Sequence, residues 1–347
     1  MGKASVGLEV GSSGVRLAMV AKSRSGPSLQ RIGYVPLQPG IVVDGDVVNV
    51  RALAEAVNTL VKATKPGSKN VHLGVVSQRM VARQVDLPWV PAKEFRKALP
   101  LLAGDLLPMP VEDCVLDFLG YEEVLDDDGS RMVRGLLVAA GEEGVLQMVD
   151  AVEDTGLRVV SVTLTPLSTL RVVADAHAPG PEAVFDIGSS MTSVTIQEHG
   201  QPHFVRILSR GGRDITAALS DQMGITEAEA ERWKTSLPAM WATMSQADRS
   251  ATEVAMRSAL SDLVTDIRTS VDFYKTSEGR PIERAYVVGG AGATLGLVPI
   301  LNGVLRVPVV AGTAQQVRTG RSLSAEEVAY AATPGSMAAV GLALGAA

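Results

Sequence analysis

The sequence contains few aromatic residues and almost no cysteine. Phe, Trp and Tyr make up 4% of the 347 residues, whereas hydrophobic residues make up 46%, so aliphatic side chains must build the core. Such a composition is typical of an α/β protein with buried, valine-rich strands. The single cysteine, Cys114, excludes an intramolecular disulfide framework and a cluster of thiolate metal ligands.

Long apolar runs and clusters of positive charge are missing as well. No stretch approaches the roughly 18 consecutive apolar residues that a membrane span needs, and the first residues lead directly into a strand without the apolar segment of a signal peptide. The net charge of −6 argues against a general nucleic-acid-binding protein. We therefore expect a cytoplasmic protein, for which any association with a membrane must come through a partner.

One short pattern occurs twice, half a chain apart. Residues 8–13 read Leu-Glu-Val-Gly-Ser-Ser, and residues 185–190 read Phe-Asp-Ile-Gly-Ser-Ser. In each copy an apolar run contains one acid, turns at a glycine, offers two hydroxyl groups and continues as an apolar run, which is the pattern of a β-hairpin. One copy would be weak evidence, but two copies indicate a duplicated architecture.

These two turns have the chemistry of a phosphate site. Glycine lets successive backbone N–H groups converge on an anion. The acids Glu9 and Asp186 would repel a phosphate unless a divalent cation lay between, and Mg²⁺ binds carboxylates, waters and phosphate oxygens together. Two such hairpins facing one another would hold the phosphates of a nucleotide from both sides. For Glu9 the alternative is an ion pair with Arg16 across the hairpin.

Periodicity divides the chain into three parts. The first half, residues 1–84, is expected to contain strands at 5–11, 14–21, 30–35 and 71–76 and a helix at 51–63. Residues 85–160, interrupted by prolines, predict a small α/β insertion with helices at 92–107 and 142–155, strands at 112–124 and 131–140, and a further strand at 158–164.

The second half, residues 161–327, repeats the strand pattern at 182–197 and 201–208. Helices are expected at 213–222, 226–235 and 247–277, strands at 283–288 and 307–310, and a loop followed by a helix at 291–300. A last helix, at 329–344, is rich in small residues, and residues 328–347 are predicted to pack back on the first half. The sequence thus predicts a duplicated α/β fold with a small insertion.

Taken in order along the chain, these motifs resemble those of a known superfamily, the nucleotide-binding proteins that include actin, heat-shock chaperones and sugar kinases. Within it the chain resembles the PilM family of actin-like type IV pilus assembly proteins, which is related to the cell-division protein FtsA. The segments that carry the resemblance are residues 7–16, 87–88, 107–112, 116–117, 230–234, 266–274, 287–293 and 341–344. The resemblance implies an actin-like ATPase fold, a duplicated ribonuclease H-like architecture, with ATP in the cleft between the two halves.

The resemblance also assigns roles to individual residues. Donors to the β- and γ-phosphates would be Gly11, Ser12, Ser13, Gly14, Gly188, Ser189 and Ser190. Gly211 and Gly212, at a helix N-terminus, would lie on the phosphate side. Gly289, Gly290 and Ala291 would contact adenosine. Glu231 and Lys234 would face ribose and adenine, or else form an i,i+3 ion pair with each other. Glu9 and Asp186 would be the Mg²⁺ ligands.

One departure from the family concerns turnover. Relatives carry acids near the end of the strand that leaves the insertion, whereas residues 162–167 here contain Thr163 and Thr165. Hydrolysis needs a group that positions or deprotonates water in line with the γ-phosphate. Because the sequence offers no such group, we expect a slow ATPase at best.

By resemblance the chain would be an ATP-binding scaffold of the pilus inner-membrane platform. It would capture the N-terminal peptide of a PilN-like membrane protein in a nucleotide-dependent manner. Other pilus platform or motor proteins and a second copy of the chain are further candidate partners. The alternatives are a sugar- or acetate-kinase-type phosphotransferase, a filament-forming homologue such as FtsA, and a structural adaptor that binds no nucleotide.

Overall fold

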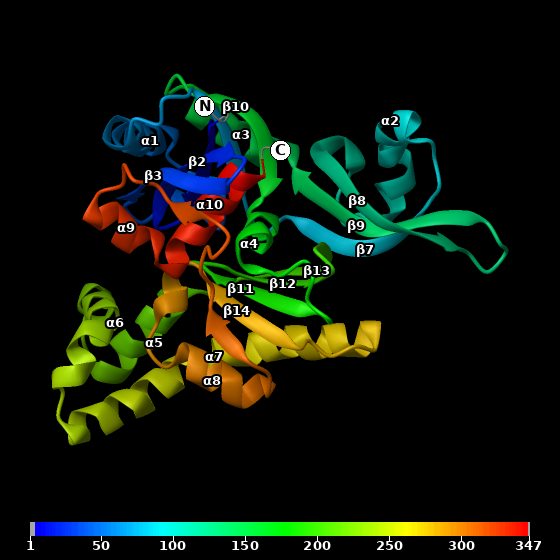
Figure 1. Ribbon diagram of the computed structural model, residues 1–347. Coiled ribbons are helices and arrows are strands. Elements are labelled where there is room, and N and C mark those ends of the chain that lie inside the picture. The colour runs from blue at the N-terminus through cyan, green and yellow to red at the C-terminus, as the bar shows by residue number, and fades with distance from the viewer. Residues whose placement is uncertain (1–3, 346–347) are drawn as a thin grey trace.

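The computed structural model describes residues 4–345 (Figure 1). The ends of two predicted ranges, residues 1–3 and 346–347, lie outside this description. Two sheets, each covered by helices, are stacked along the molecule, and a third, smaller sheet projects from one side. Among the described residues, no helix combines the length and the apolar character needed to cross a bilayer.

The first sheet has six strands in the order β10-β6-β1-β2-β3-β16. They are β1 (Ala4–Gly11), β2 (Gly14–Ser23), β3 (Gly26–Pro36), β6 (Asn70–Val75), β10 (Arg158–Leu164) and β16 (Arg318–Thr319). Strands β1 to β3 form an antiparallel meander, while β6 and β10 add in parallel. Helix α1 (Val50–Thr64) buries one leucine- and valine-rich stripe on this sheet, and the two-residue strands β4 (Val42–Val43) and β5 (Asp46–Val47) lie between β3 and α1 in the chain.

The second sheet repeats this topology in the order β13-β12-β11-β14-β15. Its strands are β11 (Glu182–Ile187), β12 (Thr192–Glu198), β13 (Gln201–Leu208), β14 (Arg284–Val288) and β15 (Val309–Ala311). Here too a three-stranded antiparallel meander is extended by two parallel strands. The duplication predicted from two six-residue motifs is therefore confirmed in strand order and direction.

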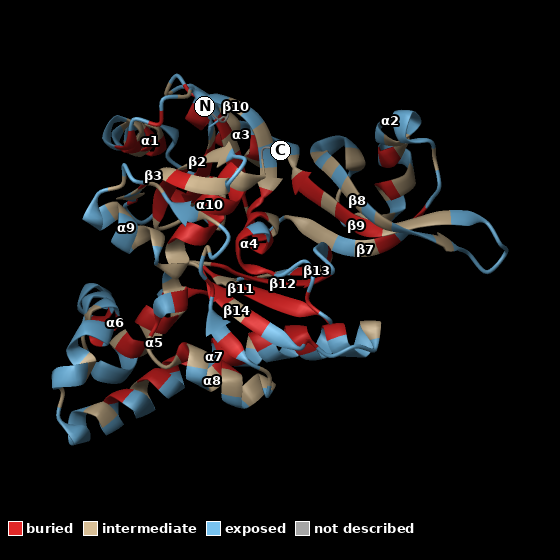
Figure 2. Ribbon diagram, in the orientation of Figure 1, coloured by how far each residue is buried: buried red, intermediate tan, exposed pale blue. Residues whose placement is uncertain are grey.

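Helices α5 (Gly212–Met223), α6 (Glu227–Met240), α7 (Gln246–Glu278) and α8 (Leu297–Leu305) accompany the second sheet. The long helix α7 follows from its pattern, because the apolar residues that recur every three to four positions are buried as one stripe: Met256, Leu260, Leu263, Ile267, Val271 and Tyr274. Strands β11 and β12 are buried along almost their whole length, as Figure 2 shows.

The third sheet differs in extent from the predicted insertion, residues 85–160. It pairs β7 (Val81–Pro88), β9 (Arg131–Gly141) and β8 (Cys114–Leu125), with α2 (Ala92–Ala103) beside it. Strand β7 starts before residue 85. Helix α3 (Glu142–Glu153) packs on α1, and β10 hydrogen-bonds to β6, so both belong with the first sheet. The boundaries of the insertion depend on which strands pair, and the local amino-acid composition does not reveal that pairing.

Two helices lie where the halves meet. The predicted strand at 158–164 is β10, but helix α4 (Thr165–Val173), which follows it, was not predicted; Pro166 occupies its first turn, where a missing N–H costs nothing. The predicted helix at 329–344 is two helices, α9 (Ala325–Ala331) and α10 (Met337–Leu344), separated by a turn at Pro334–Ser336. Helix α10 packs on β1, β2 and α4 and is buried (Figure 2).

Candidate functional site

The two hairpin turns meet in the structure. The Oγ atoms of Ser12 and Ser190 lie 2.9 Å apart within hydrogen-bonding distance, although the residues are half a chain apart. A pocket of about 60 Å³ opens at this junction. The predicted site residues that line it are Glu9, Gly11, Ser12, Ser13, Asp186, Gly188, Ser189, Ser190, Gly289 and Gly290.

Glycine is required at residue 289, where the loop that was predicted to contact adenosine reaches this pocket. Gly289 has φ of +87°, a left-handed conformation that side chains rarely adopt, and a Cβ there would lie 2.5 Å from Asp186 Oδ1. Its N–H donates to the carbonyl of Pro334 over 3.0 Å. The Gly289–Gly290 loop therefore lies directly against Asp186 and Ile187 of the second hairpin, and its contact with adenosine stays a prediction.

The charges behind the turns come from two acids and one arginine. Arg16 Nη1 lies 3.3 Å from Glu9 Oε1, so the ion pair considered as the alternative for Glu9 is present. Both side chains are largely buried, and Glu9 Oε2 and Arg16 Nε have no hydrogen-bond partner among the described residues. Burial raises the pKa of Asp186 to about 7, and the neighbouring Glu9 adds to the rise while Arg16 opposes it. Burial also raises the pKa of Glu9 despite Arg16.

These shifts predict how stability depends on pH. Between about pH 4 and pH 7 the folded protein retains a proton on Asp186 that the unfolded chain has already lost, so the free energy of unfolding should fall as the pH rises through this window. Asp186→Asn, which mimics the protonated acid, should flatten this dependence. Urea unfolding at several pH values checks it, and equal slopes in both proteins would contradict the assignment.

Two tyrosines near Arg16 were not identified from the sequence. The Arg16 guanidinium lies 5.0 Å from the ring centroid of Tyr34, and the rings of Tyr34 and Tyr330 stack with centroids 6.0 Å apart. The Tyr34 hydroxyl donates to the carbonyl of Ser13 over 3.0 Å. Gly14 does not line the pocket; its Cα faces the Tyr34 ring so closely that no Cβ fits. Tyr34 therefore fixes the first turn from outside.

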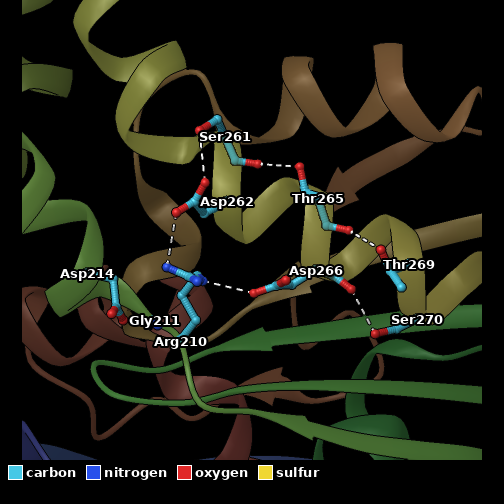
Figure 3. Close-up of polar contacts among 9 residues, drawn as sticks. All are labelled: Arg210, Gly211, Asp214, Ser261, Asp262, Thr265, Asp266, Thr269 and Ser270. Atoms are coloured by element: carbon cyan, nitrogen blue, oxygen red, sulfur yellow. Dashed lines mark hydrogen bonds and ion pairs between the residues drawn. The ribbon is translucent and has the colours of Figure 1, made fainter.

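Gly211 and Gly212 lie beside the second turn without lining the pocket. The N–H of Gly212 donates to the carbonyl of Gly188 over 2.9 Å, and that of Gly211 donates to Asp214 over 2.7 Å. Arg210, just before them, bonds Asp266 of α7 at 2.8 Å and approaches Asp262 at 3.4 Å (Figure 3). In this structure the amide of Gly212 supports the second turn and that of Gly211 bonds the first turn of α5, and a phosphate would have to replace these partners.

Glu231 and Lys234 form the ion pair that we considered as the alternative to a nucleotide contact. Lys234 Nζ lies 2.6 Å from Glu231 Oε2, and it also donates to Gly212 O and Thr216 Oγ1, each over 2.8 Å. The lysine is buried, and its three donors are all used. The Glu231–Lys234 pair thus joins α6 to the N-terminus of α5.

Ala291 does not line the pocket either, but its methyl group lies against Gly212.

The donor set agrees with a magnesium ion bound together with phosphates. No group of three or more His, Cys, Asp or Glu side chains within residues 4–345 forms a complete metal site. However, Mg²⁺ in nucleotide sites usually takes only one or two carboxylates and completes its shell with water and phosphate oxygens. Glu9 and Asp186 offer two carboxylates with the Arg16 guanidinium as the neighbouring positive charge, and within residues 4–345 the buried Glu9 Oε2 has no hydrogen-bond partner. The residues present therefore fit the ion.

A larger groove lies between the third sheet and the two halves. It measures about 470 Å³, within the range of small-ligand sites. Its walls come from β8, β9, β10, α3 and α4 and from the β12–β13 turn, and its lining is mostly aliphatic, including Val115, Leu119, Val162, Leu164, Leu167 and Leu170. The charged side chains that line it are Asp117 and Arg171.

Comparison with other proteins shows which family this chain matches. Residues 7–347 match the family described as type IV pilus assembly protein PilM. Cell division protein FtsA of Streptococcus pneumoniae serotype 2 is 24% identical over 250 residues, covering 66% of this chain and 54% of that protein. FtsA of Bacillus subtilis is 22% identical over 255 residues, covering 67% and 57%. The chain thus spans a little over half the length of these curated relatives.

Solved structures agree. A chain of the PilM-PilN type IV pilus biogenesis complex superposes with a TM-score of 0.81 at 25% identity, covering 98% of this chain and 97% of that one. The ethanolamine utilization protein EutJ of Carboxydothermus hydrogenoformans superposes with a TM-score of 0.59 at 15% identity, covering 99% and 90%, which shows the shared fold alone. With an actin-like ATPase fold and a family match over nearly its whole length, this chain belongs to the PilM family of type IV pilus assembly proteins.

Proposed function

We propose that the chain is an ATP-binding scaffold of the type IV pilus inner-membrane platform, which captures the N-terminal peptide of a PilN-like membrane protein. One observation carries the nucleotide part of the proposal: the two hairpin turns converge at Ser12 and Ser190, with Glu9 and Asp186 directly behind them. Family membership supports the pilus part, and the named PilM-PilN complex supports the partner.

Nucleotide binding requires the two turns to separate. A pocket of about 60 Å³ holds a few water molecules, whereas ligand sites measure about 300–1,000 Å³. A phosphate group placed between the turns would have to break the contact between Ser12 and Ser190. The protein would then have two arrangements, with the turns touching or held apart by phosphate, and ATP would shift the population toward the second.

With Mg-ATP bound, each of the residues at the turns would have its own role. Glu9 and Asp186 would hold Mg²⁺, which would neutralise the phosphates. Arg16 would pair with Glu9 and oppose the rise in its pKa that burial causes, and the serines and turn amides would orient the phosphate oxygens. In the part of the chain that the structure describes, the titratable side chains that line the pocket are Glu9, Arg16 and Asp186, so these residues leave no further side chain there to activate water. This supports nucleotide binding with slow hydrolysis at best, and it weakens the kinase alternative, which needs a carboxylate base for its acceptor.

The partner peptide would lie in the groove of about 470 Å³. An aliphatic lining with one arginine and one aspartate suits an extended apolar segment that carries a complementary charge near each. The groove lies between the third sheet and the two halves, and the resemblance to the PilM family implies a peptide site in this region, between the first half and residues 85–160. Capture of a membrane protein's tail there would hold the scaffold at the inner face of the cytoplasmic membrane.

Calorimetry tests the proposal in two titrations. We expect Mg-ATP to bind the full chain, and a synthetic N-terminal peptide of the PilN-like protein of the same organism to bind more tightly once Mg-ATP is present. If the peptide binds and Mg-ATP does not, the chain is a structural adaptor whose hairpin turns no longer bind nucleotide. If Mg-ATP binds and the peptide does not, the scaffold part of the proposal fails.

A further inference from the structure

Helix α4 lines both candidate sites, and we propose that it transmits nucleotide binding to the peptide groove. This inference rests on the proposed function and concerns how its two sites communicate. Thr165 and Pro166, at the start of α4, line the phosphate pocket. Leu167, Leu170 and Arg171, on the same helix, line the groove. Because the helix has nine residues, at about 1.5 Å per residue the two ends lie roughly 13 Å apart.

The start of α4 is suited to respond to phosphate. No side chain caps its first turn, and although Pro166 has no N–H, the end of the helix that lines the pocket carries the partial positive charge of a helix N-terminus. Thr165 is 5% exposed, and its Oγ1 has no hydrogen-bond partner among the described residues. A phosphate that entered between the hairpin turns would therefore interact with this helix end as well.

The rest of α4 has one face that lines the groove and another that is buried between the sheets. Leu170 and Arg171 come three and four residues after Leu167, so the three share one face of the helix, and all of them line the groove. The opposite face is buried between the sheets, where α4 contacts β6 and β10 of the first sheet and β11 and β12 of the second. A change in the relative position of the two sheets must therefore move α4 against at least one of them.

The contact between α4 and α10 permits such a movement. Ser168 Oγ donates to the carbonyl of Ala338 over 3.2 Å, and at Gly341 the α10 backbone approaches Ser168 too closely for any Cβ. Small residues on both helices leave a smooth interface, and smooth helix interfaces accommodate shear displacements. Sliding of α4 along α10 would displace Leu167 and Leu170 and so change the wall of the groove.

The test compares two identical truncations at groove-lining residues of two different elements. Leu167 lies on α4 and Leu119 on β8; both are half-buried, and both pack against the same apolar cluster. For each variant, fluorescence anisotropy of the labelled N-terminal peptide gives its affinity without and with saturating Mg-ATP. The ratio of the two affinities is the coupling factor, which for allosteric proteins is typically about 5- to 150-fold.

We expect both truncations to weaken peptide binding, because both remove apolar contact. Leu167→Ala should also bring the coupling factor to within about twofold of unity, whereas Leu119→Ala should leave it at the wild-type value. Equal coupling factors in the two variants would overturn the role of α4 while leaving the proposed function intact. A wild-type coupling factor of one would instead show that the proposed switch is wrong, and the inference would fail with it.

A second measurement does not depend on any variant. Hydrogen exchange of the full chain should show slower exchange for amides of residues 165–173 when Mg-ATP is added, and again when the peptide is added alone. Helix α8, residues 297–305, lines neither site and serves as the internal reference. Unchanged exchange in α4 with both ligands demonstrably bound would overturn the proposal.

Discussion

The Asp186→Asn variant is expected to lose at least about a hundredfold in affinity for Mg-ATP, or about 2.8 kcal/mol. The substitution keeps the shape of the side chain and removes its charge. Glu9, the other carboxylate at the turns, is already paired with Arg16, so without Asp186 the site would have little net negative charge left to attract the cation. Isothermal calorimetry with and without Mg²⁺ measures the loss.

Proton release provides a second readout for the same variant. Because the pKa of Asp186 is raised to about 7, a fraction of wild-type molecules hold a proton there near neutral pH, and a bound cation would expel it. Titrations in two buffers of different ionisation enthalpy should reveal that release in the wild type and none in Asp186→Asn. Asp221→Asn, on the exposed face of α5, is the control and should match the wild type. Tight Mg-ATP binding by Asp186→Asn would remove the metal role from this residue.

The Gly7→Ala variant is expected to be destabilised by about 3 kcal/mol, the upper part of the usual range for overpacking. Gly7 lies in β1 where α10 crosses it, and a Cβ would lie 2.5 Å from the backbone nitrogen of Ala343 and 2.7 Å from Leu342 Cβ. Backbone atoms cannot rotate away as a flexible side chain can, so the helix or the strand must move. The midpoint of urea unfolding reports the change.

A matched glycine substitution separates this clash from the general effect of adding a methyl group. Gly303 lies in α8, and a Cβ there would meet no atom within 4 Å. Gly303→Ala should therefore leave stability unchanged or raise it by up to about 1 kcal/mol, since alanine is the better helix former. If Gly7→Ala unfolds at the same urea concentration as the wild type, α10 does not pack on β1 as described.

The features that the sequence predicted well are those whose cause is local. The hairpins at Gly11 and Gly188 need a glycine, small residues and flanking β-branched strands, and all three requirements fall within a dozen residues. The stripe on α7 is likewise visible as a spacing of three to four residues. Repetition of one local motif then allowed the duplicated topology to be inferred.

The features that the sequence did not predict depend on distant partners. Strand β10 belongs with β6 because of a pairing across more than 80 residues, and nothing within residues 158–164 reveals it. Tyr34 and Tyr330 meet beside Arg16 only after the two halves have packed. The backbone amides of Gly211 and Gly212 illustrate the same limit, because a sequence shows that N–H groups are present but not which carbonyl or carboxylate they bond.

The contact between β1 and α10 also bears on how the chain is made. Strand β1 begins at residue 4, and the helix that covers it ends at residue 344. At a ribosomal rate of about 5–20 residues per second, roughly 20 to 70 seconds separate the synthesis of the two. Throughout that interval the face of the first sheet that α10 covers, which includes Ala18 and Val20 of β2, lacks its cover, so apolar surface stays exposed until α10 has been made.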